Sequence, residues 1–342
     1  MSVVVDCTMD TALKNIVILA TGGTIAGAGE QGKDIGYKSG SIKAQTLIDA
    51  IPELKNVANI FVEQVCNINS DDITSEIWIS IALRIKELFE NGFGDSHELV
   101  DGIVIMHGTD TMEETAFFLS LVLNVAKPVI LTGSMRPATA AEPDGPANLL
   151  FAVKCAVEQS LQRPERAEGT ILSNAEGSSD SPVRIAFAGK LMDSRTVQKI
   201  HANDLDAFAE IGTAQSSRPT FDISSLRSLP KVTVLYFNAD ADADLVRYAA
   251  ERSAGLVIAG AGAGEFSQSW MNAIGDVVAK SNVPVVISTR INRGSIVPEQ
   301  LLVPGTIAAY SLPPAKAAVL LRLALTITND PAAIQKFYQR YT

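Results

Sequence analysis

The chain has 342 residues, of which 47% are hydrophobic and 19% are charged, and its formal net charge is −10. This length exceeds what one compact core usually holds, so it predicts two domains. The acidic balance argues against nucleic-acid binding, which needs a basic face, but not against a small zwitterionic substrate. No apolar tract approaches the length that spans a bilayer, so we expect no membrane partner.

Cysteine and histidine are scarce in this chain, which contains Cys7, Cys66, Cys155, His97, His107 and His201. The cysteines are widely separated and form no CxxC pair, so we expect reduced thiols and neither a zinc site nor a disulfide framework. Three histidines leave little for a Ser–His–Asp triad or a metal cluster, and GxSxG and HExxH are absent. Any catalysis would therefore fall to hydroxyls, carboxylates, lysine or tyrosine.

The first residues, MSVVVDCTMDTALKN, lack the basic region, the apolar core and the small-residue cleavage site of a secretory signal. This predicts a cytoplasmic location. A leader that had already been removed would make the protein periplasmic instead.

Short apolar runs alternate along the chain with longer segments of helical period. The expected strands are Ile16–Ala20, Ile60–Val65, Gly102–Met106, Pro128–Leu131, Ile185–Ala188, Val232–Phe237, Gly255–Ala259 and Val283–Ile287. The expected helices are Thr74–Phe89, Met112–Asn124, Ala147–Gln159, Ala241–Arg252, Ser267–Lys280 and Pro314–Ile327. Near-continuous apolar strands between helices are buried on both faces, which predicts a two-domain α/β fold with a mostly parallel sheet in the larger N-terminal domain.

The alternation is interrupted between Ala209 and Pro230, where Gly, Ser, Pro and Thr are frequent. We therefore predict an N-terminal catalytic α/β domain at 1–212, a linker at 213–230 and a smaller C-terminal α/β domain at 231–342. Gly27–Ser41 and Ser173–Pro182 have the composition of mobile loops.

A glycine-rich loop, Ala20–Gly27 (ATGGTIAG), follows the first expected strand. Loops at the carboxyl ends of strands line the ligand crevice of an open α/β sheet. The paired glycines allow a tight turn that leaves the Thr24 hydroxyl at its tip. An ordinary strand-end turn explains this motif alone equally well, whereas the missing GxGxxG spacing and P-loop lysine argue against nucleotide binding.

A second loop, His107–Thr115 (HGTDTMEET), also ends a strand and opens a helix. Thr109 or Thr111 could cap that helix, and the two glutamates suit its positive end. Capping does not explain Asp110 beside Thr109, where a hydroxyl and a carboxylate near a lysine would form a proton-handling unit. We interpret His107 as an oriented structural histidine rather than a base.

These two loops resemble the signatures of the bacterial type-II L-asparaginases and glutaminase-asparaginases. Gly133–Thr139 (GSMRPAT), Asp144–Leu149 (DGPANL) and the ending DPAAIQKFY resemble them as well. The resemblance extends from about Asn15 to Tyr341. It implies an amidohydrolase that converts L-asparagine and water to L-aspartate and ammonia, without a metal or other cofactor. It also implies a homotetramer whose sites lie between one subunit's N-terminal domain and its neighbour's C-terminal domain.

The resemblance implies a role for each matching residue. Thr24 would be the nucleophile, and Tyr37 in the loop GYKSG would help to deprotonate it. Thr109, Asp110 and Lys199 would form a second triad, with Lys199 matched through DSRTVQK at 193–199. Backbone amides near Thr24 and Thr109 would stabilise the oxyanion.

The substrate's amino-acid end is assigned, again by resemblance, to four further residues. Ser70 and Asp71 in NSDD would hold its α-carboxylate and α-amino groups. The segment GAGAGE places Glu265 where most relatives have a small polar residue from a neighbouring subunit, and Glu299 is the nearby candidate for a second acid. Asp71 stands where relatives carry Gln or Glu.

Plainer interpretations of individual residues stay open at this point. Tyr37 could be a loop aromatic, Ser70 and Asp71 a turn or N-cap before the Thr74 helix, and Lys199 a surface lysine. The chain also differs from the resembling family by an insertion at 169–184 and a shortening at 208–221. Two other functions therefore compete with asparagine hydrolysis: hydrolysis of glutamine or another small amide, and amino-acid binding without turnover.

Overall fold

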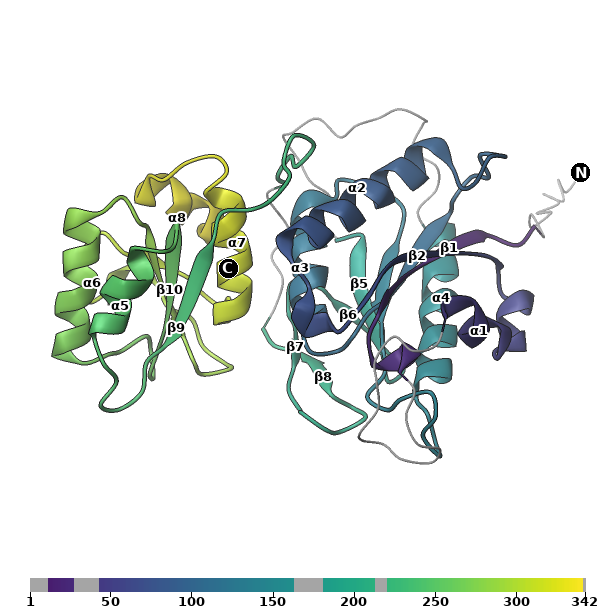
Figure 1. The fold of residues 1–342 in the computed structure, drawn as a ribbon, viewed down its shortest axis with the longest axis horizontal. Coiled ribbons are helices and arrows are strands. Elements are labelled where there is room, and N and C mark those ends of the chain that lie inside the picture. The colour runs from purple at the N-terminus through teal and green to yellow at the C-terminus, as the bar shows by residue number, and fades with distance from the viewer. Residues whose placement is uncertain (1–11, 28–42, 163–180, 213–219, 341–342) are drawn as a thin grey trace, which may run out of the picture.

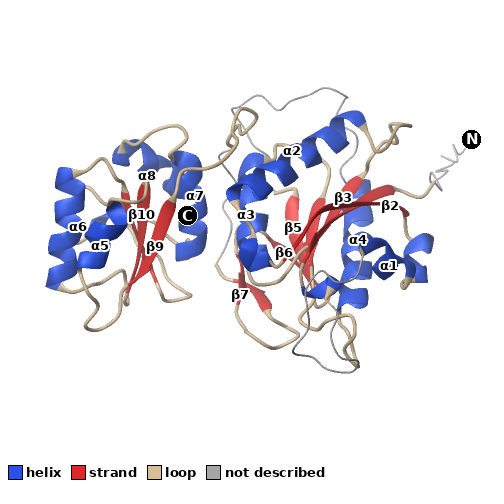
Figure 2. Cartoon of the chain, in the orientation of Figure 1, coloured by secondary structure: helices blue, strands red, loops and turns tan. Residues whose placement is uncertain are grey.

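The computed structural model describes residues 12–27, 43–162, 181–212 and 220–340. They form two α/β units, each with its own sheet and flanking helices (Figure 1; Figure 2). The predicted two-domain α/β fold is thus confirmed. No helix among these residues is long and apolar enough to cross a membrane.

The larger sheet has six strands in the order β2-β1-β3-β4-β5-β6. Its strands are β1 (Asn15–Gly22), β2 (Asn59–Ile68), β3 (Gly102–Met106), β4 (Val129–Thr132), β5 (Val183–Phe187) and β6 (Lys190–Asp193). All neighbours are parallel except β5 and β6. A separate antiparallel pair consists of β7 (Val197–Lys199) and β8 (Phe208–Glu210).

Helices cover both faces of this sheet (Figure 2). They are α1 (Ala44–Asp49), α2 (Ser75–Asn91), α3 (Met112–Val122) and α4 (Gly145–Gln162). Successive strand residues face opposite sides, so Val17 and Leu19 of β1 pack in one core with α2 and α3, while Ile16 and Ile18 pack in another with α1 and α4. Burial on both faces is why β1 and β3 are almost wholly apolar.

The smaller sheet is parallel throughout, with the order β12-β11-β10-β9. Its elements are β9 (Val232–Tyr236), α5 (Asp244–Ala250), β10 (Gly255–Gly260), α6 (Gln268–Lys280), β11 (Val285–Thr289), β12 (Ile307–Ala308), α7 (Pro314–Ala324) and α8 (Pro331–Gln339). Leu256 and Ile258 pack with α5 and α6, and Val257 on the opposite face shares a core with α7.

All eight expected strands and six expected helices exist, with shifts at their ends. The expected set omitted β6, β7, β8 and β12, which are short and carry no long apolar run. It also omitted α1 and α8. The latter has a readable signal, because the Asp330 side chain caps the helix at the backbone of Ala333 and Pro331 occupies its first turn.

The linker predicted at 213–230 falls between β8 and β9, and its first part lies outside the described residues. Its described part packs on the larger unit, because Phe221 is buried and its backbone N–H donates to the Leu121 carbonyl at 2.8 Å. A domain division there remains our proposal. The loops predicted at Gly27–Ser41 and Ser173–Pro182 lie almost entirely outside the described residues.

Candidate active site

Three loops with functional side chains begin at the same edge of the larger sheet. They follow β1, β2 and β3, which are parallel neighbours, so their carboxyl ends coincide. After β1 the chain first forms β2 on one side of β1 and then β3 on its other side. The strand order therefore reverses at β1, and the topological switch point lies between β1 and β3. This is the position where open α/β sheets bind their ligands.

The loop after β1 depends on its two glycines. Gly22 and Gly23 have φ angles of 107° and 78°, in the left-handed region. A Cβ on Gly22 would lie 2.5 Å from the Ile68 carbonyl oxygen, and one on Gly23 would lie 2.5 Å from the Gly108 amide nitrogen. The loops after β1 and β3 therefore meet backbone to backbone. Thr24 starts a short 3-10 turn here and is partly exposed.

The loop after β3 brings three predicted residues together. The Lys199 ammonium donates to the Thr109 hydroxyl at 3.0 Å and to Asp110 Oδ1 at 2.6 Å. Thr109 is buried, and the Lys199 side chain is 15% exposed against 68% for Asp110. Lys199 is therefore not a solvated surface lysine. The contact brings the Lys199 ammonium to a neighbouring hydroxyl and carboxylate that lie 90 and 89 residues earlier in the chain.

Glu113 is a residue whose site contact the sequence did not reveal. It lies in the first turn of α3, where the sequence explained it only as a charge suited to the helix end. In the structure its Oε2 accepts the Lys199 backbone N–H at 2.7 Å. Burial raises its pKa, whereas the nearby Lys316 ammonium and this hydrogen bond lower it. Burial and the Glu113 charge raise the pKa of the adjacent Glu114 to about 7.

The helix-capping interpretation of Thr109 and Thr111 is wrong. Thr111 stands at the N-cap position of α3 but makes no side-chain cap hydrogen bond. Its hydroxyl donates to the Ser70 carbonyl at 2.6 Å, and the Thr109 hydroxyl accepts from Lys199. Neither hydroxyl caps the start of α3: the Thr111 hydroxyl contacts the loop after β2, and the Thr109 hydroxyl contacts the end of β7.

The loop after β2 places Ser70 beside the loops that follow β1 and β3. Ser70 is buried, and a Cβ on Gly108 would lie 2.7 Å from its Oγ. Asp71 follows in the same 3-10 turn and is exposed. The N-cap of α2 is Thr74, whose hydroxyl accepts from the Ile77 backbone, so neither Ser70 nor Asp71 serves as that cap.

A fourth loop, after β4, is shaped by Asp144 and Asn148. The Asp144 carboxylate accepts the backbone N–H groups of Met135 and Arg136, both at 2.9 Å. The Asn148 side chain donates to the Gly133 carbonyl at 3.0 Å. These bonds explain why DGPANL accompanies GSMRPAT, since its polar side chains supply the partners of that loop's backbone.

Two of the predicted residues are not brought to this site, and a third is not described. Tyr37 lies outside the described residues. Glu265, after β10, and Glu299, in a 3-10 turn, are exposed residues of the smaller unit. Across the described parts of the chain, no hydrogen bond or ion pair joins either carboxylate to Thr24 or Thr109. The same residues contain no group of three or more His, Cys, Asp or Glu side chains arranged to hold a metal ion.

Comparison with known proteins places these motifs in one family. Residues 15–222 match the family model described as "Asparaginase, N-terminal". Residues 231–338 match the model described as "Glutaminase/Asparaginase C-terminal domain". The chain belongs to the asparaginase family. The resemblance seen in TGGTIAG and HGTDTMEET is thereby confirmed.

The relatives of this asparaginase-family chain align over nearly its whole length. L-asparaginase 2 of Bacillus subtilis is 37% identical over 96% of this chain and 87% of its own. The glutaminase-asparaginase of Pseudomonas fluorescens is 35% identical over 97% and 91%, respectively. A crystal structure of the probable cytoplasmic L-asparaginase from Campylobacter jejuni superimposes with a TM-score of 0.81, at 36% identity, covering 96% of this chain and all of that one.

Proposed function

We propose that this chain hydrolyses the side-chain amide of L-asparagine to L-aspartate and ammonia. The observation that carries the proposal is the contact of Lys199 with Thr109 and Asp110 beside the Thr24 loop, at the switch point of the sheet. Relatives named L-asparaginase support the choice of substrate.

In the proposed reaction Thr24 acts as nucleophile. A threonine hydroxyl needs a nearby base at neutral pH, a role we assign to Tyr37. As Oγ bonds to the amide carbon, its proton leaves and backbone N–H groups near Thr24 and Thr109 stabilise the oxyanion. The C–N bond then breaks, and the departing nitrogen takes up a proton and leaves as ammonia. Water attacks the acyl-enzyme in the second step, and the Thr24 oxygen leaves with a proton.

The unit of Thr109, Asp110 and Lys199 would move protons in both steps. The lysine donates a hydrogen bond to each of the other two groups. Its ammonium can therefore stabilise the threonine oxygen when that hydroxyl gives up or accepts a proton. Its mostly buried side chain strengthens these interactions relative to bulk water. This geometry suits water activation or delivery of a proton to the leaving amine.

The substrate's amino-acid end would lie at Ser70 and Asp71, on the loop next to Thr24. Glu265 and Glu299 are exposed residues of the smaller unit, and by the family resemblance they would add carboxylates from a neighbouring subunit. We therefore propose a homotetramer, as the family resemblance implies. Light scattering of the purified chain tests this: a monomer would remove both glutamates from the site.

Glutamine is the second candidate substrate, because relatives of similar identity are named glutaminase-asparaginase. Ammonia release from asparagine, glutamine and their D-forms tests both candidates. Turnover of asparagine is the expected result. Binding without turnover would identify a non-catalytic relative, and turnover confined to another amide would change the substrate but not the mechanism.

We propose a cytoplasmic location, supported by the C. jejuni relative, which is named a probable cytoplasmic L-asparaginase. A Haemophilus influenzae relative is named periplasmic. Fractionation of the native host decides between the two compartments.

A further inference from the structure

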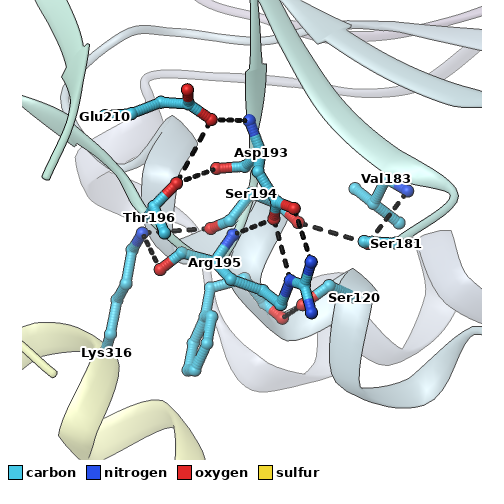
Figure 3. Close-up of polar contacts among 10 residues, drawn as sticks. Ser120, Ser181, Val183, Asp193, Ser194, Arg195, Thr196, Glu210 and Lys316 are labelled. Carbon is cyan, nitrogen blue, oxygen red and sulfur yellow. Dashed lines mark hydrogen bonds and ion pairs between the residues drawn. The ribbon is translucent and has the colours of Figure 1, made fainter. Parts of the chain in front are cut away.

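Lys316 is a fully buried lysine on α7 of the smaller unit, with an exposed fraction of 0%. Figure 3 shows its side chain rising from α7 to the backbone that links β6 to β7 in the larger unit. Its ammonium donates to the carbonyls of Ser194 at 3.0 Å, Arg195 at 3.3 Å and Val197 at 2.5 Å. An ammonium has three N–H donors, so all three have acceptors on one short segment.

That segment leads directly to Lys199. Val197 is the first residue of β7 and Lys199 its last, so a hydrogen bond to the Val197 carbonyl fixes the start of the strand that carries Lys199. The end of β7 is fixed by the bond from the Lys199 backbone N–H to Glu113. Together with the pairing of β7 to β8, these two contacts position the backbone from which the Lys199 side chain extends toward Thr109.

The turn before β7 is held by side chains as well (Figure 3). The Arg195 guanidinium donates to both carboxylate oxygens of Asp193, at 3.0 and 2.6 Å, and both side chains are almost fully buried. The Asp193 backbone N–H donates to Glu210 Oε1 at 2.6 Å. These partners all belong to the larger unit. Lys316 adds a contact from the smaller unit.

The charges around Lys316 favour its ammonium form. Negative charge from the carboxylates of Glu113, Glu114 and Asp193 raises the pKa of Lys316. The centre of the Phe117 ring lies 5.5 Å from the Lys316 nitrogen. Burial nevertheless lowers the pKa of Lys316 to about 8, because desolvation opposes the charged form. Burial raises the pKa of Glu113, the carboxyl that accepts the Lys199 backbone N–H, and the Lys316 ammonium opposes that rise. Lys316 thus supports both ends of β7, one by hydrogen bonds and the other by charge.

We propose that Lys316 is a positioning residue for Lys199: it fixes β7 from the smaller unit without touching the substrate. This inference rests on the proposed function, in which Lys199 moves protons. An interdomain tether with no influence on catalysis is the alternative. The two differ in whether activity per folded molecule depends on Lys316.

The test compares Lys316→Met with Lys280→Met, an exposed lysine of the same unit that pairs with Asp276. The first readout is amide hydrogen exchange of a peptide spanning 193–199, with β1 and β3 as internal references. We expect exchange of this peptide to rise about tenfold or more in Lys316→Met alone. Unchanged exchange would show that the lysine does not hold β7 and would overturn the proposal.

The second readout is kcat for ammonia release from asparagine, measured well below each variant's melting temperature. Displacement of a catalytic group by about 1 Å can cost on the order of 100-fold in rate. We expect kcat to fall by roughly 10- to 100-fold, with KM changed far less. In a Lys199→Met background, Lys316→Met should add little further loss, because its effect passes through Lys199. Unchanged kcat per folded molecule, or losses that multiply, would leave only a tether.

Should Lys316→Met fail to fold, Lys316→Met with Glu113→Gln replaces it and is compared with Glu113→Gln alone. Glutamine keeps an oxygen for the Lys199 N–H, and the pair leaves no uncompensated buried carboxylate at this position. A wild-type protein inactive on every amide would overturn the proposed function, and the exchange experiment would still decide whether Lys316 holds β7.

Discussion

His107 and Thr115 are hydrogen-bonded inside the larger unit, with 2.9 Å between the imidazole Nε2 and the hydroxyl oxygen. The Trp78 indole N–H donates to the same hydroxyl at 2.8 Å, and His107 Nδ1 lies 2.7 Å from the Gly108 carbonyl oxygen. A carbonyl only accepts, so Nδ1 carries the proton and Nε2 accepts from Thr115. His107 is thus a neutral, oriented histidine that holds the peptide before Thr109.

This network predicts a pH dependence of stability. Burial lowers the pKa of His107 to about 4 from its ordinary value of 6.5. Between these values the unfolded chain binds the proton and the folded chain does not, so stability is lost as pH falls. The loss attributable to His107 is about 2–3 kcal/mol at pH 4.5. Urea unfolding of wild type and His107→Gln at pH 7 and 4.5 measures it, with His201→Gln as the exposed control; equal pH dependence in wild type and His107→Gln would contradict it.

Thr24→Ala should abolish ammonia release while the fold persists. Thr24 is partly exposed in a turn whose shape is set by Gly22 and Gly23, so loss of its hydroxyl leaves the core intact. Removal of a nucleophile costs several orders of magnitude in kcat. Steady-state kinetics and a thermal melt measure the two effects, and Thr24→Ser is the control that keeps a hydroxyl. Turnover like that of wild type in pure Thr24→Ala would refute the mechanism.

Lys199→Met should be nearly as damaging as Thr109→Val, and the double variant should lose little more than either. Their side chains are in contact at 3.0 Å, and residues that act as one unit give strongly non-additive losses. A double-mutant cycle on kcat/KM measures this. Losses that multiply would mean that Lys199 and Thr109 act independently, and Lys190→Met, at an exposed ion pair with Asp206, controls for charge.

Asp71→Glu should change the preference between asparagine and glutamine. Asp71 is exposed beside the buried Ser70, on the loop next to Thr24, and is one methylene shorter than glutamate. One methylene in a pocket is worth about 1–3 kcal/mol, or roughly 10- to 200-fold in kcat/KM. Wild type should therefore prefer asparagine by about that factor. Kinetics with both amides measures the ratio, and an unchanged ratio would show that Asp71 does not touch the substrate.

The sequence was informative wherever one local pattern carried the structural signal. β1 and β3 contain continuous apolar runs followed by loops with glycine and threonine, so their position and the location of Thr24 and Thr109 could be predicted directly from the sequence. The strand β7 is only three residues long and pairs with a strand beyond a turn, which no periodicity reveals. Lys199 was therefore found by resemblance alone.

Glu113 and Lys316 show a different limit of sequence analysis. Glu113 lies in the first turn of α3, where acidic residues are favoured by the helix dipole. Because this local role already accounts for the residue, the sequence did not indicate its hydrogen bond to Lys199. Lys316 carried a usable signal: it is a charged residue on the otherwise apolar first half of α7. Its partners are backbone carbonyls, which leave no trace in the sequence.

One hydrophobic core crosses from the larger unit to the smaller. It joins residues such as Phe117 and Phe118 of α3 with Leu320 of α7, and Phe221 lies against Phe337 with 5.2 Å between ring centroids. Neither sheet can lose its structure without exposing apolar surface that the other also needs. The two units should accordingly unfold as one cooperative system, giving a single calorimetric transition whose enthalpy matches the van't Hoff value. A gene divided between the two sheets would then give halves that each lack part of their shared core.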